Sequence, residues 1–274
     1  MQPFLKWPGG KRWLISNYRH IFPTEYNCYF EPFLGGGSAF FSMMPQRAMI
    51  SDINAALINT YHVMKRTPAQ LRNLLVQHQE QHSIIHYYAV RAAIPEDRIE
   101  QAARFLYLNR TCFNGMYRVN RLGEFNVPIG TKLRFTDDIQ FFEEYSAALQ
   151  NAHIRKQDFV TAIHNAGDGD FIFADPPYTI AHNQNAFIKY NERIFSWTDQ
   201  RRLLNALIRA RDRGATILAT NANYPDIQQM YADHNFYTRP LRRFSSISGI
   251  AGGRGIQEEL LISSYQVDYE QEAQ

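Results

Sequence analysis

The sequence predicts an α/β protein built on a doubly wound parallel sheet, with a second segment inserted into the sheet domain. Residues 1–66 and 150–274 alternate short apolar strands with helical patterns, as such sheets do. In the first stretch a strand runs into three consecutive glycines and then a helix, which is the nucleotide-binding unit of these sheets. Over residues 67–149 the alternation stops. We therefore expect a discontinuous sheet domain (1–66 and 150–274) and an inserted domain (67–149).

The composition is that of a globular protein. Of the 274 residues, 45% are hydrophobic and 20% are charged, which argues against a disordered chain. The formal net charge of +3 is compatible with a nucleic-acid partner but does not establish one. Cys28 and Cys112 stand in unrelated contexts and indicate neither a disulfide framework nor a cysteine zinc site. The start lacks an apolar signal core and no uncharged apolar run approaches ~20 residues, so we expect a cytoplasmic protein without a membrane span.

The first stretch begins with a loop at residues 4–11 and contains two strand–helix units. The expected elements are, in order, a helix at 12–21, a strand from Tyr29, a helix at 39–44 capped by Ser38, a strand at 48–52 and a helix at 55–65. Asp52 ends the second strand, 17 residues after Gly35. An acid about 20 residues past the glycine turn is the group that binds a ribose diol.

The inserted segment is expected to be helical and then to form a basic hairpin. Helical patterns cover residues 69–82, 84–94 and 98–109, and the hairpin follows over 110–132 with its turn at 121–124. The hairpin interleaves arginines and a lysine with asparagines and aromatic rings, which are the groups that contact DNA phosphates and base edges. A solvated loop that is basic by chance would explain the same composition.

The strand–helix alternation resumes at His153. The expected elements are a strand at 153–159 ending in the acid Asp158, a helix at 159–166, a strand at 171–174, a helix at 199–213 capped by Thr198 or Asp199, a strand at 215–219, a helix at 224–233, and strands at 236–240 and 260–265. The glycine- and arginine-rich segment 242–255 between the last two strands is expected to be a mobile loop that an anionic partner could order.

The turn Asp175-Pro176-Pro177-Tyr178 is the strongest functional candidate. It follows the apolar run Phe171–Phe173, and two prolines must end that strand and stiffen the backbone. Asp175 and Tyr178 are thus held in a fixed relation at the carboxyl edge of the sheet, where ligands bind. A carboxylate followed by an aromatic face suits a flat ring that carries an amine. A strand-ending turn with a solvated acid is the plainer alternative.

Groups that suit a nucleoside fall on the same predicted edge. The glycine turn offers bare backbone, Asp52 suits a ribose, and Asp158 suits a heterocycle amine with Phe159 packed on the ring. The segment Gly9-Gly10-Lys11-Arg12 lacks the spacing and the Ser or Thr of a Walker loop, so no triphosphate cradle is present. An adenosine cofactor without phosphates is therefore favoured, and S-adenosyl-L-methionine is the obvious one.

Four motifs in order give the chain a family resemblance. They are Lys6-Trp7-Pro8-Gly9-Gly10-Lys11, Glu31-Pro32-Phe33-Leu34-Gly35-Gly36-Gly37, Ser51-Asp52-Ile53-Asn54 and Ala174-Asp175-Pro176-Pro177-Tyr178. With them the chain resembles, over nearly its whole length, the α group of Dam-type DNA adenine-specific (N6) methyltransferases. The segments Leu108–Arg110, Phe113–Gly115 and Gly123–Pro128 look like the DNA-reading hairpin of that family. The resemblance implies a Rossmann-like methyltransferase sheet with target recognition inserted between the cofactor and catalytic motifs.

The resemblance also implies a set of site residues. S-adenosyl-L-methionine would be bound by Trp7, Lys11, Phe33, Gly35, Asp52, Asp158 and Phe159, with Lys11 near the methionine carboxylate. Asp175 and the Pro176 carbonyl would accept from the target amine, and Tyr178 would stack on an adenine flipped out of double-stranded DNA. Neither a metal nor a covalent intermediate is needed for this reaction.

DNA contacts are expected mainly from the inserted hairpin. The candidate DNA-binding residues are Arg110, Asn114, Arg118, Asn120, Pro128, Lys132 and Arg243. Arg118 is expected to read a guanine edge, Asn120 and Pro128 to contact neighbouring base pairs, and the other cations to contact phosphates. The family suggests a GATC site. The hairpin has Thr111-Cys112 and Thr131-Lys132-Leu133 where more aromatic residues would be expected, which leaves a longer or relaxed GA-containing site open.

Several alternatives stand beside this interpretation. A cytosine-N4 methyltransferase tends to carry Ser where Asp175 stands, and a protein-glutamine methyltransferase tends to carry Asn there. Neither cysteine follows a proline, which disfavours cytosine-carbon methylation. A catalytically silent DNA-binding relative would keep the fold without the reaction. His78, His82 and His86 share a helical face that we expect to be solvated. A monomer from a prokaryote or phage is expected, whether or not it belongs to a restriction-modification system.

Overall fold

The computed structural model describes residues 1–120, 123–178, 195–245 and 255–267. In these residues seven strands form one mixed sheet with the order β3-β2-β1-β4-β5-β7-β6. The strands are β1 (Tyr29–Glu31), β2 (Ala48–Asp52), β3 (Ala152–Lys156), β4 (Phe171–Ala174), β5 (Thr216–Ala222), β6 (Tyr237–Ser245) and β7 (Gly255–Ser263). The predicted α/β fold class is confirmed.

The sheet is parallel where the functional motifs lie. β1 pairs in parallel with β2 and β4, and β4 pairs in parallel with β5, whereas β7 runs antiparallel to β5 and β6. Tyr29 of β1 lies opposite Ala48 of β2 and Phe171 of β4. Because the carboxyl ends of parallel neighbours meet at one edge, β1, β2 and β4 all end at the same edge of the sheet.

The chain divides into two compact units. One unit comprises Met1–Lys11, Leu34–Gln46 and Ser51–Lys156, and the other comprises Arg12–Phe33, Arg47–Ile50 and Gln157–Gln274. The whole of the expected inserted domain, residues 67–149, belongs to the first unit, together with the N-terminal loop and the glycine turn. The finer boundaries of a sheet domain and a recognition domain stay a prediction.

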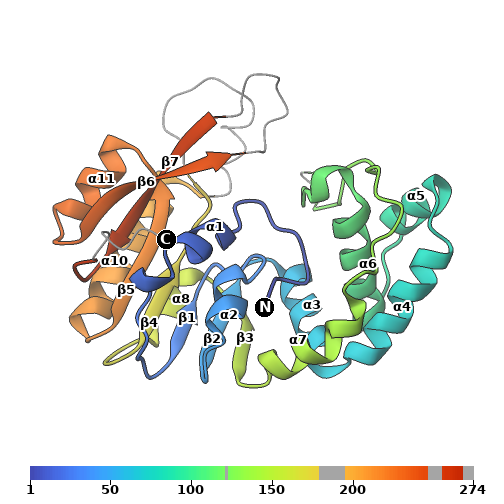
Figure 1. Ribbon diagram of the computed structural model, residues 1–274, viewed down its shortest axis with the longest axis horizontal. Coiled ribbons are helices and arrows are strands. Elements are labelled where there is room, and N and C mark those ends of the chain that lie inside the picture. Colours follow the sequence, from blue (N-terminus) through green and yellow to red (C-terminus); the bar gives the residue numbers. More distant parts are fainter. Residues whose placement is uncertain (121–122, 179–194, 246–254, 268–274) are drawn as a thin grey trace. The chain divides into compact units, whose positions relative to one another are not determined.

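Helices dominate the first unit. They are α2 (Ser38–Met43), α3 (Ala55–Arg66), α4 (Pro68–Glu80), α5 (Ile84–Ala92), α6 (Arg98–Thr111) and α7 (Phe142–Leu149), with 3-10 turns η2 (Phe113–Gly115) and η3 (Ile139–Phe141). The three helices expected at the start of the insertion are present, with ends shifted by up to two residues. α6 packs against α3, α4 and α5, and Figure 1 shows α4, α5 and α6 grouped together. The C-terminal half of α6 is buried, so it forms the centre of this helical core.

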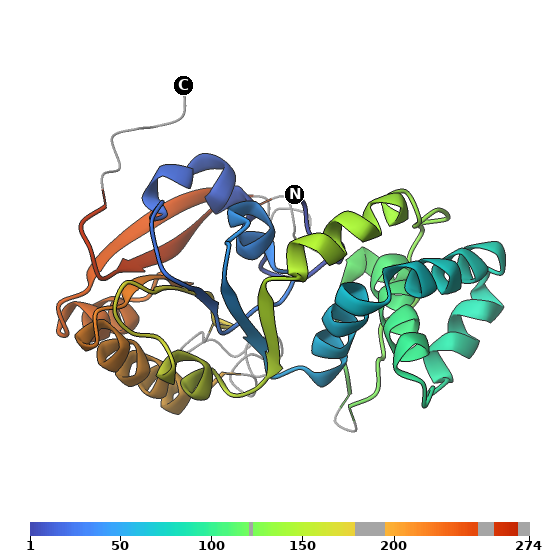
Figure 2. The same ribbon diagram turned by 90° about the horizontal axis from the view of Figure 1, so that it is seen from below.

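The second unit surrounds the buried strand β4. Its described helices are α1 (Arg12–Asn17), the 3-10 turn η1 (Arg19–Ile21), α8 (Phe159–His164), α10 (Trp197–Asp212) and α11 (Pro225–Ala232). α8 and α10 lie side by side (Figure 2). All four residues of β4 are buried, which is why its sequence is a continuous apolar run rather than an alternation.

Three helix starts and ends differ from the expectations. The helix expected at 12–21 breaks into α1 and η1. Ser38 does not cap α2, because Gly37 occupies the N-cap with a left-handed backbone (φ 67°) and Ser38 is already helical. Ser196, not Thr198 or Asp199, caps α10: its hydroxyl accepts from the Asp199 amide, and the Asp199 carboxylate accepts from the Ser196 amide.

The expected mobile loop at 242–255 and the expected hairpin at 110–132 both contain residues in strands or β-bridges. β6 and β7 extend into the segment 242–255, whose remaining residues 246–254 lie outside the described residues. In the inserted hairpin an antiparallel bridge joins Val119 and Phe125, and the turn expected at 121–124 includes two residues, 121–122, outside the description. Among the described residues no helix is long and apolar enough to span a membrane.

Candidate active site and DNA-contacting hairpin

The turn that follows β4 is held by side chains from the next two strands of the sheet. The Thr220 hydroxyl on β5 donates to Asp175 Oδ1 at 2.6 Å. The Tyr178 hydroxyl donates to Glu259 Oε2 on β7, also at 2.6 Å. Asp175 and Tyr178 are half-buried, whereas Pro176 between them is buried. The turn therefore presents its carboxylate and its ring in fixed orientations, as the paired prolines predict.

Tyr178 is a hydrogen-bond donor and not a phenolate. Burial, followed by the negative charges of Asp175 and Glu259, raises the pKa of Tyr178 well above its usual value. Its proton is committed to Glu259, so the ring is anchored at its hydroxyl end. Sequence reasoning missed both Thr220 and Glu259, because each lies within an apolar strand and nothing in the local pattern marks a functional polar group.

Asp158 and the aromatic residues near it form a second cluster in the same unit. Asp158 caps α8 by accepting from the Val160 amide, and its carboxylate pairs with Arg202 Nη2 at 2.9 Å. The Phe159 ring stacks on Phe33 with centroids 5.2 Å apart, and the Arg202 guanidinium lies 4.8 Å from its centroid. Phe159 is buried while Phe33 is half-buried. Both rings were expected at a cofactor site, and Phe33 is the more exposed of the two.

In the first unit, Asp52 closes the glycine turn. Its Oδ2 accepts from the Gly35 amide at 3.0 Å and its Oδ1 accepts from the Asn54 amide at 2.9 Å. Burial raises the pKa of Asp52, an effect that these backbone donors oppose. Gly35 has φ 48°, and a Cβ there would lie 2.6 Å from Trp7 Cδ1. Only glycine fits both the backbone conformation and the approach of the tryptophan.

Trp7 connects this glycine turn with the inserted hairpin. Its ring stacks on Tyr117 with centroids 5.2 Å apart and an interplanar angle of 22°. The Asn109 side chain accepts from the Lys6 amide and donates to the Lys6 carbonyl, which fixes the loop that carries Trp7. Lys11 is buried, and its ammonium donates to the Gly9 carbonyl at 2.8 Å. The sequence did not identify Tyr117 or Asn109 as partners of this loop, because the contacts join segments about a hundred residues apart.

The hairpin exposes several of the predicted DNA-binding side chains. Arg118 is exposed, and its Nε donates to Asn126 Oδ1 at 2.9 Å. The Asn120 side chain donates to Glu124 Oε2 at 2.7 Å and accepts from the Glu124 amide. Three further candidates are exposed, namely Asn114, Pro128 and Lys132. Arg243 lies on β6, but its side chain is outside the described residues.

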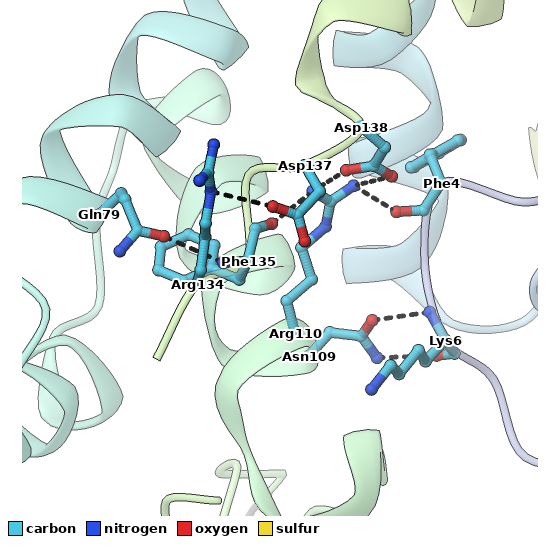
Figure 3. Close-up of polar contacts among 9 residues, drawn as sticks. All are labelled: Phe4, Lys6, Gln79, Asn109, Arg110, Arg134, Phe135, Asp137 and Asp138. Atoms are coloured by element: carbon cyan, nitrogen blue, oxygen red, sulfur yellow. Dashed lines mark hydrogen bonds and ion pairs between the residues drawn. The ribbon is translucent and has the colours of Figure 1, made fainter. Parts of the chain in front are cut away.

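Arg110 is a correction to the expected DNA contacts. Its side chain is only 5% exposed, and its guanidinium donates to both carboxylate oxygens of Asp138 at 2.6 and 3.0 Å. It also donates to the carbonyls of Phe135 and Phe4, so that it joins three segments of the first unit (Figure 3). A guanidinium that donates to four internal acceptors is not available at the surface to bind a DNA phosphate. We assign Arg110 a structural role.

The helical face with three histidines is also not the solvated surface expected. His78 stacks on Tyr107 with centroids 4.8 Å apart, and a hydrogen bond joins His78 Nδ1 with His86 Nε2. His82 Nδ1 is bonded to the Tyr107 hydroxyl, and its Nε2 to the Lys132 carbonyl. Within the described residues no cluster of three or more histidine, cysteine or acidic side chains could hold a metal. These histidines pack the helical core instead.

The histidine cluster makes stability depend on pH. Burial, and then the charge of His86, lower the pKa of His78 to about 4. The unfolded chain takes up a proton at this side chain below its usual pKa of about 6.5, but the folded chain does not until about pH 4. We expect the melting temperature to fall as the pH drops from 6.5 to 4. His78→Gln should flatten that dependence in thermal melts, and a variant with an unchanged profile would contradict the assignment.

Comparison with known proteins identifies the family. The model of the D12 class N6 adenine-specific DNA methyltransferases matches residues 7–243. The type II methyltransferase M1.LlaDCHI of Lactococcus lactis subsp. cremoris is 37% identical, over 97% of this chain and 96% of that protein. The DNA N-6-adenine-methyltransferase of Escherichia phage P1 is 36% identical over 93% of this chain, which covers 34% of that protein.

A third relative is similar over a comparable length. The DNA adenine methylase of Escherichia coli (strain K12) is 30% identical over 94% of this chain and 93% of that protein. The family match contains the glycine turn, the hairpin and the Asp175–Tyr178 turn, so it covers the motifs on which the sequence resemblance rests. The chain belongs to the D12 class of N6 adenine-specific DNA methyltransferases.

Proposed function

We propose that this protein transfers a methyl group from S-adenosyl-L-methionine to the N6 amine of an adenine that it flips out of double-stranded DNA. The observation that carries the proposal is the fixed turn after β4, in which Thr220 orients the Asp175 carboxylate and Glu259 anchors the Tyr178 ring. The amine is out of reach inside the base stack, so the duplex must release the base at a cost of a few kcal/mol. Tyr178 then offers that base an aromatic face.

The chemistry suits these groups. An adenine amine is a weak nucleophile because its lone pair is delocalised into the ring. When Asp175 and the Pro176 carbonyl accept its two hydrogens, the nitrogen becomes pyramidal and the lone pair can attack. The cofactor would supply the methyl group and leave as a thioether, and the proton that the amine nitrogen loses would pass to water. The Asp175 carboxylate stabilises the positive charge that develops on the nitrogen, and alignment of the two reactants supplies much of the rate.

The residues around the glycine turn fit an adenosine cofactor without phosphates. When bound, S-adenosyl-L-methionine supplies an activated methyl group on a sulfonium. Gly35 brings bare backbone close to a ligand, and a Cβ at this position would displace Trp7. Asp52 accepts from backbone amides that include those of Gly35 and Asn54, and we propose that its remaining lone pairs accept from ribose hydroxyls. We propose Lys11 for the methionine carboxylate, and Asp158 and Phe33 for the adenine ring.

A direct assay tests the proposal. Purified protein is incubated with methyl-labelled S-adenosyl-L-methionine and unmethylated duplex DNA, and the methylated positions are read by sequencing. We expect N6-methyladenine within GATC or a related GA-containing site. Methylation at cytosine N4 would reverse the choice of substrate that Asp175 indicates. Sequence-specific DNA binding with no transfer at all would show a catalytically silent relative.

Arg118 is proposed to determine part of the recognition sequence. Its Nε is held by Asn126, so the two terminal nitrogens of the guanidinium are oriented for a guanine edge. Arg118→Ala is expected to cost ~1–3 kcal/mol of discrimination at one base pair. Competition among duplexes that differ at single positions measures this loss. An unchanged site preference would contradict the assignment.

Lys132→Ala is the matched control for Arg118→Ala. Lys132 is an exposed cation that we propose contacts a phosphate. Its loss should weaken binding to all sequences alike and reduce the slope of log affinity against log salt by about 0.9. Loss of discrimination at a base pair in this variant as well would show that the two side chains do not have separate roles.

A further inference from the structure

Two polar side chains that take no direct part in the proposed reaction hold the turn after β4. Asp175 accepts from Thr220, which is 1% exposed, and Tyr178 donates to Glu259, which is 4% exposed. The two supporting residues come from strands that pair with each other, since Ala222 of β5 lies opposite Glu259 and Thr220 lies opposite Leu261. The support is therefore part of the sheet and not of a loop.

We propose that Thr220 and Glu259 are positioning residues for methyl transfer. Thr220 sets the rotation of the Asp175 carboxylate toward the target amine, and Glu259 sets the direction in which the Tyr178 ring projects toward the flipped base. This inference rests on the proposed function, because it deepens the role of the same site. Neither residue touches the reacting atoms. Each acts by fixing a side chain that does.

The energetics of burial favour a positioning role for Glu259. Taking a carboxylate out of water costs several kcal/mol unless hydrogen bonds compensate for the lost hydration. An apolar residue would be the ordinary choice within a buried strand such as β7. The carboxylate at this position accepts from the Tyr178 hydroxyl at 2.6 Å. Because the hydroxyl is bonded to Glu259, rotation about the Cα–Cβ bond would break the contact, and the direction in which the Tyr178 ring projects is therefore fixed.

A second buried polar pair keeps the end of β5 rigid beside Thr220. Asn221 and Gln200 of α10 are both fully buried. The Asn221 amide donates to Gln200 Oε1 at 2.9 Å, and the Gln200 amide donates to Asn221 Oδ1 at 3.3 Å. The residue next to Thr220 is thus tied to the helix that packs on the sheet. Such a scaffold holds catalytic groups within the small tolerance that preorganisation demands.

Matched substitutions separate positioning from other roles. Glu259→Gln and Thr220→Ser keep an acceptor or hydroxyl at each position, whereas Glu259→Leu and Thr220→Val remove it. We expect the single-turnover rate of methyl transfer to fall by about 10²-fold in the Leu and Val variants, with the KM for the cofactor unchanged. The Gln and Ser variants should retain most of the rate. A Gln variant as slow as the Leu variant would mean that charge, not position, is what Glu259 supplies.

A spectroscopic readout tests the ring directly. With 2-aminopurine in place of the target adenine, stacking of the flipped base on Tyr178 shortens the fluorescence lifetime. In the Glu259→Leu complex the short-lifetime component should shrink, and in Glu259→Gln it should persist. Equal lifetimes in the parent and the Leu variant would overturn the assignment of Glu259.

One further measurement does not depend on methyl transfer. Melting temperatures of Tyr178→Phe, Glu259→Leu and the double variant report whether the two side chains are coupled in the folded protein, because each single variant removes the hydrogen bond. From this inference we expect the double variant to melt close to the less stable single variant. Additive shifts would show that the hydrogen bond is not formed and would overturn it. Failure of the parent protein to methylate DNA, with the coupling present, would instead count against the proposed function alone.

Discussion

Asp175→Ala is expected to reduce methyl transfer to DNA by roughly 10²–10³-fold, the range found when one preorganised partner of a developing charge is removed. In the proposed reaction the carboxylate accepts from the target amine and lies beside the positive charge that forms on it. Its orientation is fixed by a hydrogen bond from the Thr220 hydroxyl. Incorporation of labelled methyl groups into duplex DNA under single-turnover conditions measures the effect. Binding of the cofactor and of DNA should change little.

Two further variants make the Asp175 result specific. Asp175→Asn keeps the shape and one acceptor oxygen but removes the negative charge, and it should also be slow. Asp233→Ala removes an exposed acid at the end of α11 and should transfer at the parental rate. If Asp175→Asn were as fast as the parent protein, the charge would not be needed, and the argument from electrostatic stabilisation would be wrong.

The Asp175–Tyr178 turn could be predicted from sequence because its signals are local. The apolar run of β4 indicates a buried strand, and the two prolines end it. Backbone geometry then places Asp175 and Tyr178, the residues on either side of the prolines. The same holds for Asp52, whose distance from the glycine turn follows from the length of one strand–helix unit. The parallel pairing of β1, β2 and β4 then brings the ends of these strands to one edge of the sheet.

The partners of these groups could not be predicted, because they depend on tertiary contacts. Glu259 lies 81 residues from Tyr178, and Thr220 lies 45 residues from Asp175. Each occurs in a strand pattern that only the register of the sheet can interpret. Phe33 and Phe159 were both expected at the cofactor site, and their different exposure could not be predicted for the same reason: the sequence does not show that Arg202 lies over the Phe159 ring.

Arg110 shows how composition misleads when an acceptor is distant. It opens a basic segment, and a basic segment next to a recognition hairpin predicts phosphate contacts. The acceptors that bury it are Asp138, 28 residues away, and the Phe4 carbonyl, 106 residues away. A run of basic residues in a sequence therefore predicts a DNA-contacting surface only where the fold supplies no internal acceptor for those side chains. Arg118 and Lys132, in the same segment, are exposed.

Arg110→Ala is expected to destabilise the protein by on the order of 3 kcal/mol, since removing one member of a buried ion pair is among the costliest substitutions. The variant leaves three acceptor groups without their donor, namely the Asp138 carboxylate and the backbone carbonyls of Phe4 and Phe135. Chemical denaturation followed by circular dichroism measures the free energy of unfolding. Asp138 is 38% exposed and can regain water, which keeps the expected value at the lower end for buried pairs.

Arg134→Ala is the matched control, because the neighbouring pair Arg134–Asp137 is drawn beside Arg110 in Figure 3 but is exposed on both sides, at 80% and 62%. Its loss should cost no more than about 1 kcal/mol. A phosphate contact at Arg110 predicts the reverse pattern: unchanged stability and a smaller dependence of DNA affinity on salt. Since the four internal acceptors use all four terminal N–H groups of a guanidinium that is only 5% exposed, the two measurements together decide between a role in the fold and a role on DNA.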